Sequence, residues 1–216
     1  MNEPLLRDDI EYVIHCDEKG KIIGPLSKLH AHLPGPRQVL THYSTWAMVF
    51  HPKSGRYGIQ LKNPKKHDPF GAGKWDMGIA GHNCYVKTRE RENYRSMGFA
   101  ETLTKEGDEE IGVTINVVDS IKEFSKLSNT KIKNPIGFIF EQFHYKTERN
   151  NEFVGLAMVI VPTMNVKFKD KEVVEFKWLL PAELAEFIQT KNNYCDPLPL
   201  VFEKAERFRM KFLCYS

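Results

Sequence analysis

The sequence has few cysteines, no strong excess of charge and no long apolar run, and each of these absences excludes a class of protein. Its four cysteines, Cys16, Cys84, Cys195 and Cys214, show no CxxC spacing, so neither a zinc knuckle nor a dense disulfide framework is expected. Reduced thiols of this kind are typical of a cytoplasmic protein. Residues 1–9 carry no apolar signal core, and no segment reaches the roughly 20 apolar residues of a membrane-spanning helix. We therefore expect a cytoplasmic protein without a membrane segment.

The composition is that of an ordinary globular protein. The formal net charge is +3, which is too small to indicate nucleic-acid binding. Lysines cluster in residues 62–67 and 131–133; these clusters could attract phosphates, but we interpret them as solvated loop lysines. The 216 residues are 41% hydrophobic and 27% charged, which suffices for one well-buried core but not for two generous domains. The sequence therefore predicts a single domain over residues 1–216.

Short apolar runs separated by turn residues predict more strands than helices. The expected strands cover residues 10–15, 22–24, 44–50, 57–62, 75–81, 113–118, 136–145, 153–161 and 173–178, with hairpins at 17–20 and 148–151. Helices are expected after Ser96, which we interpret as an N-cap, over residues 181–188, and over about 198–213. This mixed order favours an α/β sandwich with a mixed sheet. Residues 8–40 form an N-terminal β-hairpin extension in this prediction.

The most informative segment is an acidic helix end. Glu106, Glu109 and Glu110 follow the order E-x-x-E-E just before Gly112, and residues three or four apart share one face of a helix. Like charges there repel one another, and they also oppose the helix dipole, unless a cation lies among them. Oxygen ligands suit Mg²⁺ or Mn²⁺. The residues alone leave two interpretations open, a metal site or a solvated acidic end, and Gly112 should terminate the helix.

The same segment resembles a known family motif. Residues 105–113, KEGDEEIGV, resemble the second half of the Nudix box, R-E-U-x-E-E-x-G-U, where U is apolar. Residues 68–76 and 80–82 resemble the strand that enters the box, and residues 174–184 are similar to the closing strand and helix. The resemblance implies a Nudix fold, with a mixed β-sheet sandwiched between α-helices. It also implies Mg²⁺-dependent (or Mn²⁺-dependent) hydrolysis of a diphosphate bond in a small nucleoside diphosphate–X substrate.

The resemblance also implies roles for particular residues. Glu106, Glu109 and Glu110 would hold the metal, and Gly81 and His82 of the entering strand are the further metal-site residues that it implies. Either Glu109 or Glu152 would be the general base. Lys105 replaces the box arginine, which orients the glutamates through a forked contact that lysine cannot copy.

Other positions depart from the family pattern. Gly107 stands where an apolar residue anchors the helix, and glycine costs about 1 kcal/mol in a helix interior. The earlier box glutamate has no clean match, so Glu90, Glu92 or Glu101 could replace it, or none of them does. The segment 82–96 is longer than the family pattern, and we expect it to influence substrate specificity.

Within the family, the chain looks most like the isopentenyl-diphosphate isomerase branch and the hydrolases similar to it. The resemblance rests on the turn 17–20, on His30 or His32, and on Thr41 with His42 before the next strand. It implies a metal set of His32 (or His30), His42, His82 and Glu152, although histidines with satisfied hydrogen bonds explain the same pattern. Ala80 replaces the catalytic cysteine of the isomerases, so one acid/base group is missing and isomerase activity is not expected.

Two other functions stay open from the sequence. A catalytically weak Nudix domain could bind a nucleotide, an RNA or a protein, given Lys105, Gly107 and the unmatched glutamate. An RNA-end-processing enzyme has weak support from the lysine clusters. The sequence does not indicate the oligomeric state.

Overall fold

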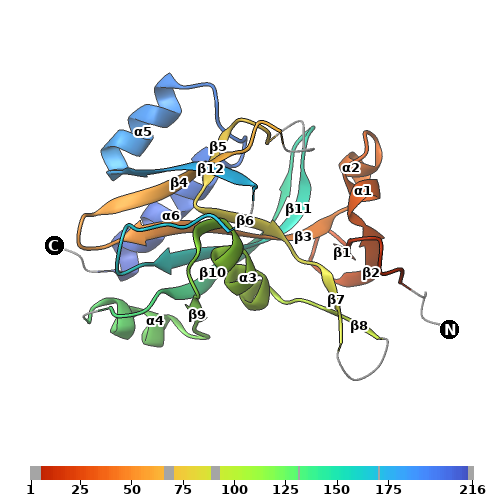
Figure 1. Ribbon diagram of the computed structural model, residues 1–216, viewed down its shortest axis with the longest axis horizontal. Coiled ribbons are helices and arrows are strands. Elements are labelled where there is room, and N and C mark those ends of the chain that lie inside the picture. Colours follow the sequence, from red (N-terminus) through yellow and green to blue (C-terminus); the bar gives the residue numbers. More distant parts are fainter. Residues whose placement is uncertain (1–5, 66–70, 89–92, 131, 170, 214–216) are drawn as a thin grey trace.

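The structure is built around a curled, mixed β-sheet with helices on both faces (Figure 1). The computed structural model describes residues 6–65, 71–88, 93–130, 132–169 and 171–213. The strands are β1 Tyr12–Cys16, β2 Ile22–Ser27, β3 His42–His51, β4 Arg56–Lys62, β5 Trp75–Met77, β6 Ile79–His82, β7 Tyr85–Lys87, β8 Tyr94–Ser96, β9 Asn116–Val117, β10 Ile136–Lys146, β11 Asn151–Ile160 and β12 Val173–Leu179. The helices are α1 Lys28–Ala31, α2 Pro36–Val39, α3 Phe99–Ile111, α4 Ile121–Ser128, α5 Pro181–Thr190 and α6 Leu198–Phe212. Within the described ranges, no helix is both long and apolar enough to cross a membrane.

The centre of the sheet is the parallel pair β3 and β11. Their register runs from Glu152 opposite His42 to Ile160 opposite Phe50. The main path of the sheet is β12-β4-β3-β11-β10-β9, with β1, β2, β5 and β6 joined at its sides. The pair β9–β10 is also parallel and the remaining pairs are antiparallel. The sheet is therefore mixed, as the order of predicted elements indicated.

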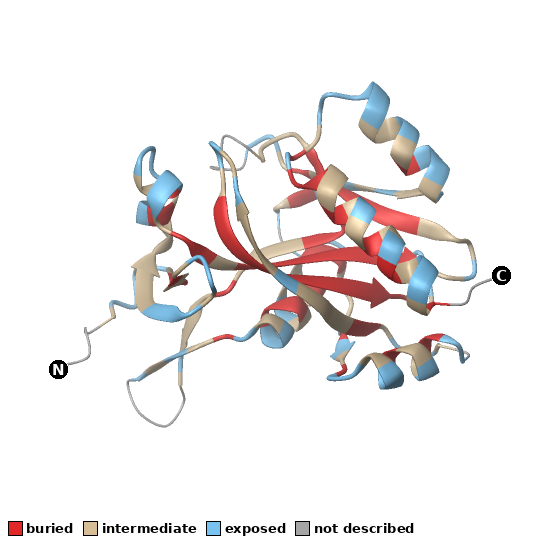
Figure 2. Cartoon of the chain, turned by 180° about the vertical axis from the view of Figure 1, so that it is seen from behind, coloured by how far each residue is buried: buried red, intermediate tan, exposed pale blue. Residues whose placement is uncertain are grey.

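Both faces of the central strands are buried. Along β3, Met48 and Phe50 belong to one apolar cluster, whereas Ala47 and Val49 belong to another, because successive side chains of a strand point to opposite faces. Helix α6 covers the first cluster and α3 covers the second. Figure 2 shows this burial in the central strands between the helices. The predicted α/β sandwich is confirmed.

Most predicted elements are present, and some details differ. The opening hairpin, the long hairpin β10–β11 and the terminal helix α6 lie where the sequence placed them. The N-terminal segment also contains the short helices α1 and α2, and residues 82–96 include the antiparallel hairpin β7–β8. The prediction that Ser96 caps α3 was wrong, because Ser96 ends β8 and Gly98 is the N-cap residue.

Candidate functional site

Helix α3 has well-defined ends that position its acidic face. At its start, the backbone N–H of Gly98 donates to Glu101, and Arg95 holds the same carboxylate at 2.6 and 2.8 Å. At its end, Gly112 has φ +70°, a left-handed conformation that favours glycine. The predicted C-terminal glycine is therefore confirmed. Leu103 and Ile111 are buried against the sheet, which fixes the rotation of the helix about its axis.

Gly107 packs closely against Ile115. A Cβ atom at this position would lie 2.4 Å from Cδ1 of Ile115, a separation that real Cβ atoms do not show. Ile115 is itself 3% exposed and packs in the α3-side core. Ile115 therefore fills the space beside Gly107, and the cost of glycine at this helix position stays a prediction.

Glu106 lies against the backbone of β6. A Cβ atom on Gly81 would come within 2.3 Å of Cδ of Glu106, so a larger residue there would displace this carboxylate from its present position. The Glu106 side chain is 14% exposed. Burial, followed by the charge of Glu110, raises the pKa of Glu106 to about 7, so the ionised form gains much from a nearby cation.

Glu110 forms a buried ion pair that the sequence analysis missed. Its Oε1 atom accepts from Nζ of Lys62 at 2.5 Å, and its Oε2 atom accepts from the backbone N–H of Ala80 at 2.9 Å. Burial lowers the pKa of Lys62, but the charges of Glu110 and Asp76 outweigh it and the net shift is upward. The interpretation of Lys62 as a solvated loop lysine was wrong. The sequence signal that could have indicated this burial is the position of Lys62 at the end of the predicted strand 57–62, because alternate side chains of a strand point to the same face of the sheet.

Lys105 bridges the two outer glutamates. Its Nζ atom lies 3.0 Å from Oε1 of Glu106 and 2.6 Å from Oε2 of Glu109. Burial lowers the pKa of Lys105, but the two carboxylates more than offset this effect and the net pKa is raised. Lysine thus contacts both glutamates as a single point charge, without the fork of an arginine. This arrangement shows that a cation fits between the two carboxylates.

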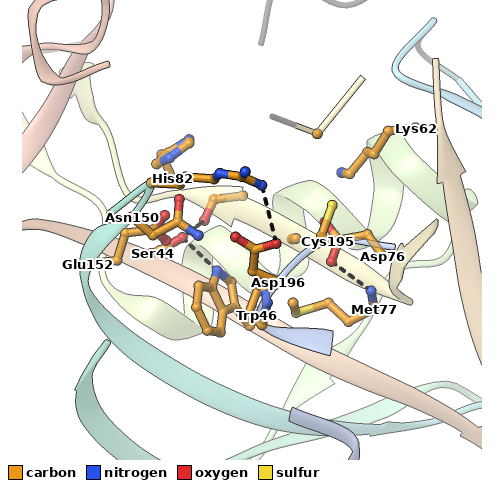
Figure 3. Close-up of a pocket in the computed structure, with 15 residues that line it drawn as sticks. Ser44, Trp46, Lys62, Asp76, Met77, His82, Asn150, Glu152, Cys195 and Asp196 are labelled. Atoms are coloured by element: carbon orange, nitrogen blue, oxygen red, sulfur yellow. Dashed lines mark hydrogen bonds and ion pairs between the residues drawn. The ribbon is translucent and has the colours of Figure 1, made fainter. Parts of the chain in front are cut away.

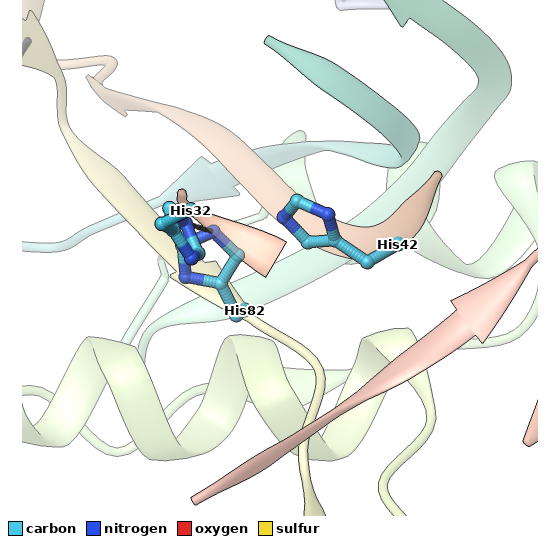
Figure 4. Close-up of side chains that lie close together, drawn as sticks. All are labelled: His32, His42 and His82. Atoms are coloured by element: carbon cyan, nitrogen blue, oxygen red, sulfur yellow. Dashed lines mark hydrogen bonds between the residues drawn. The ribbon is translucent and has the colours of Figure 1, made fainter. Parts of the chain in front are cut away.

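Three histidines from separate elements form a compact cluster beside β6 (Figure 4). His32 follows α1, His42 begins β3 and His82 ends β6. Their nearest ring nitrogens all lie within 4.8 Å of one another. Nδ1 of His32 lies 2.6 Å from the Lys28 carbonyl, and its Nε2 lies 3.2 Å from Nε2 of His82. The carbonyl requires a proton on Nδ1, which leaves the Nε2 lone pair of a neutral His32 directed into the cluster.

His42 is the buried member of the cluster. It is 2% exposed, and neither ring nitrogen makes a hydrogen bond of ordinary geometry to any part of the chain that the structure describes. Burial, followed by the nearby His32, lowers the pKa of His42 to about 3, although the Leu40 backbone opposes this shift. His42 is therefore neutral at physiological pH, which is the form that coordinates metals. A buried nitrogen without a partner is costly, so a metal ion suits this cluster.

A pocket of about 110 Å³ lies next to the cluster (Figure 3). Ser44 and Trp46 of β3 line it together with Gly81 and His82. Glu152 also lines it and is 7% exposed. Because Gly81 touches both this pocket and Glu106, the acidic face of α3 and the pocket are adjoining parts of one candidate site.

Comparison with known proteins identifies the architecture. No protein-family model and no curated protein matches this sequence. Among solved structures, DR0079 from Deinococcus radiodurans superposes with a TM-score of 0.62 at 13% identity, covering 90% of this chain and 99% of that one. A MutT protein from Methanosarcina mazei Go1 has a TM-score of 0.50 at 18% identity and covers 77% and 94% of the two chains. A NUDIX-family hydrolase from Clostridium perfringens has a TM-score of 0.47 at 12% identity, covering 80% and 97%.

The chain has the Nudix fold. At these identities the similarity establishes the fold alone, so the function has to be argued from the site. Within this Nudix fold, Lys105 contacts Glu106 and Glu109, and Gly81 lies against Glu106.

The remaining predicted site residues fall into two groups. His82 joins His32 and His42, whereas His30 is exposed and lies outside this cluster. Glu101 is bound at the start of α3 by Arg95, five positions before Glu106, and so does not lie among the three glutamates. Glu90 and Glu92 lie outside the described residues. The sequence analysis missed Lys62 and Asp76, which also line the pocket.

Replacing Gly81 by alanine should displace the Glu106 carboxylate and remove the response to Mg²⁺. The expected result is a loss of the Mg²⁺-induced rise in melting temperature, because the new Cβ occupies the place of the Glu106 side chain. The check is a thermal melt with and without MgCl₂.

Gly98→Ala is the matched control for this experiment. Its φ is −70°, and no described atom outside its chain neighbours lies within 4 Å of an added Cβ. This variant should keep the response of the parent protein. An equal Mg²⁺ response in Gly81→Ala would contradict the role given to Gly81.

Proposed function

We propose that the protein is a Mg²⁺-dependent (or Mn²⁺-dependent) pyrophosphohydrolase that cleaves a diphosphate bond in a small nucleoside diphosphate–X substrate. The observation that carries this proposal is the pair of carboxylates, Glu106 and Glu109, with a lysine ammonium held between them. A buried carboxylate with a pKa near 7 is stabilised by a hard divalent cation, and the oxygen-only donor set suits Mg²⁺.

Each glutamate has a distinct place in the proposed mechanism. Glu106, Glu109 and Glu110 would hold the ion, as the family resemblance implies. Glu110 also accepts from Lys62 and from the Ala80 backbone, and these contacts hold the end of α3 against β4 and β6. When bound, Mg²⁺ neutralises phosphate oxygens and lowers the pKa of the attacking water.

The general base is either Glu109 or Glu152. Glu109 is 42% exposed and can exchange its proton with solvent after each turnover. Glu152 lines the pocket from β11, where it faces the space that a substrate would occupy. In either case the carboxylate accepts a proton from water as the water attacks phosphorus.

A substrate screen tests the proposed function. We expect Mg²⁺-dependent phosphate release from at least one substrate among nucleoside diphosphate derivatives, dinucleotides and capped RNA. Tight binding of a nucleotide without release would favour a binding module in place of the hydrolase. Release from RNA with a steep dependence on salt concentration would favour the RNA-processing enzyme.

We also infer that His32, His42 and His82 hold a second metal ion, as the resemblance to the isomerase-like branch implied. Imidazole ligands suit Zn²⁺, Mn²⁺ or Co²⁺, and Glu152 lies beside His42 in the β3–β11 register. Ala80 bears no thiol, so isomerase activity does not form part of this proposal.

Removal of the buried histidine should abolish binding at this second site. Titration of metal-free protein with Co²⁺ is expected to produce visible absorption bands that His42→Ala loses, because the cluster then has only two imidazoles. His30→Ala is the matched control, since His30 is exposed on α1, and it should keep the bands. Bands of equal intensity in His42→Ala would contradict the assignment.

A further inference from the structure

The wall of the pocket contains an ion pair between two segments that are far apart in the sequence. Nη1 of Arg149 lies 3.8 Å from Oδ1 of Asp196. Arg149 is in the turn between β10 and β11, and Asp196 is in the segment before α6. Both residues line the pocket, together with Gly81, His82 and Glu152. The pair therefore belongs to the same pocket as Gly81, which lies against Glu106 of α3.

The backbone on each side of this pair is anchored. In the turn, the N–H groups of Arg149 and Asn150 both donate to Oγ1 of Thr147 at 3.1 Å. On the other side, the N–H of Cys195 donates to the carbonyl of Trp75 at 2.8 Å, which ties the segment to β5. The turn is thus held by its own Thr147 and the other segment by strand β5, whereas the ionic contact itself is made by exposed side chains.

The ionic contact is weak enough to be exchanged. The side chains of Arg149 and Asp196 are 50% and 39% exposed, and their separation is near the outer limit of an ion pair. Exposed pairs of this kind contribute little to stability. A ligand anion can therefore replace Asp196 as the partner of Arg149 without unfolding either segment.

Arg149 is the exposed cation among the charged side chains that line this pocket. Among the described lining residues, the carboxylates are Asp76, Glu152 and Asp196, and the permanent cations are Lys62 and Arg149. Lys62 is 4% exposed and is held by Glu110, whereas half of the Arg149 side chain is exposed. A guanidinium matches a phosphate group with two parallel hydrogen bonds.

We propose that Arg149 binds a phosphate group of the substrate, and that Asp196 is an internal competitor whose ion pair with Arg149 the substrate phosphate displaces. This assignment rests on the proposed diphosphate substrate. It makes Arg149 a binding residue and Asp196 a residue that sets the affinity. The Asp196 carboxylate weakens substrate binding, because the substrate phosphate must displace it from Arg149.

The test compares Arg149→Ala, Arg149→Lys and Asp196→Asn. For the substrate found in the screen, Arg149→Ala is expected to raise KM about 10- to 100-fold with little change in kcat, which corresponds to one lost charge-assisted contact. Arg149→Lys should lie between this variant and the parent, because lysine keeps the charge but not the fork. Asp196→Asn should lower KM, because the competitor is removed.

Arg207→Ala is the matched control. Arg207 forms an ion pair of 3.7 Å with Glu203 on α6, and both side chains are well exposed, so its loss should leave KM and kcat unchanged. A KM within twofold of the parent in Arg149→Ala would overturn the proposal. A rise in KM in Asp196→Asn equal to that in Arg149→Ala would also overturn it, because the pair would then be a structural support of the pocket.

A binding measurement separates this proposal from the proposed hydrolysis. Calorimetry with a methylene diphosphonate nucleotide in the presence of Ca²⁺ does not depend on turnover. If the parent protein binds this probe but hydrolyses nothing in the screen, weaker binding by Arg149→Ala still supports the phosphate contact, and unchanged binding overturns it. A parent protein that neither hydrolyses nor binds a diphosphate overturns both proposals.

Discussion

Replacement of Glu109 by glutamine should reduce Mg²⁺-dependent diphosphate hydrolysis by about 100- to 10,000-fold, the range expected when a general base is lost. Glutamine keeps the shape of the side chain and can still accept a hydrogen bond from Lys105, which lies 2.6 Å from Oε2 of Glu109. It cannot supply a negative charge to the ion or accept a proton. The measurement is the initial rate at saturating MgCl₂, with a circular dichroism melt to verify that the fold is intact.

Asp108→Asn is the control for this experiment. Asp108 is the residue before Glu109 on α3, but its carboxylate is paired with Lys169, away from Lys105. Its replacement removes one negative charge from the same helix turn and should leave the rate within a few-fold of the parent. If Glu109→Gln retains turnover near the parent level while Glu152→Gln loses it, the base is Glu152 and the role given to Glu109 is wrong.

Replacement of Lys62 by methionine should lower the free energy of unfolding by about 3–5 kcal/mol, the cost of leaving one partner of a buried ion pair alone. Methionine fills a similar volume but leaves Oε1 of Glu110 without its ammonium partner in a site where Glu110 is 0% exposed. The measurement is urea unfolding at pH 7.5, with the slope checked for two-state behaviour.

The effect of Lys62→Met should also depend on pH with a definite sign. Burial already raises the pKa of Glu110, and Lys62 opposes that rise, so removal of Lys62 raises this pKa further. A carboxyl group whose pKa is higher in the folded than in the unfolded state lowers the free energy of unfolding when it is ionised. This loss of stability is complete above the folded-state pKa, and it shrinks as the pH falls toward the unfolded-state pKa. The variant should therefore lose less stability at pH 5 than at pH 7.5.

Two further variants show whether the ion pair is the cause. Lys62→Met combined with Glu110→Gln removes both charges and should recover much of the lost stability. Lys177→Met removes an exposed lysine, 3.4 Å from Glu175 on β12, and should cost less than about 1 kcal/mol. A loss below about 1 kcal/mol in Lys62→Met itself would contradict the structural role of this pair.

The acidic helix could be predicted because its features are local. The spacing of Glu106, Glu109 and Glu110 places them on one side of a helix whatever the rest of the fold does. Gly112 ends the helix because a left-handed residue is easiest for glycine. The hairpin strands and α6 were predictable for the same reason, since alternation and turn residues act over a few neighbouring positions.

The contacts that complete the site could not be predicted from local patterns. Lys62 and Glu110 are 48 positions apart, and their pairing depends on how β4 and α3 both pack around β6. Glu152 lies opposite His42 only because β11 and β3 are parallel in one particular register. A shift of one residue in that register would turn Glu152 to the other face.

The sequence by itself determined the fold class, the acidic face of α3 and the glycine that ends this helix, because short-range geometry and hydrophobic periodicity decide these features. The tertiary structure decided that Lys62 is a buried counter-ion, that Gly107 makes room for Ile115, and that His32, His42 and His82 meet. Each of these depends on side chains from separate elements that the curled sheet brings together. Burial in the tertiary structure also sets the charge states of two site residues, because it raises the pKa of Glu106 and lowers the pKa of His42.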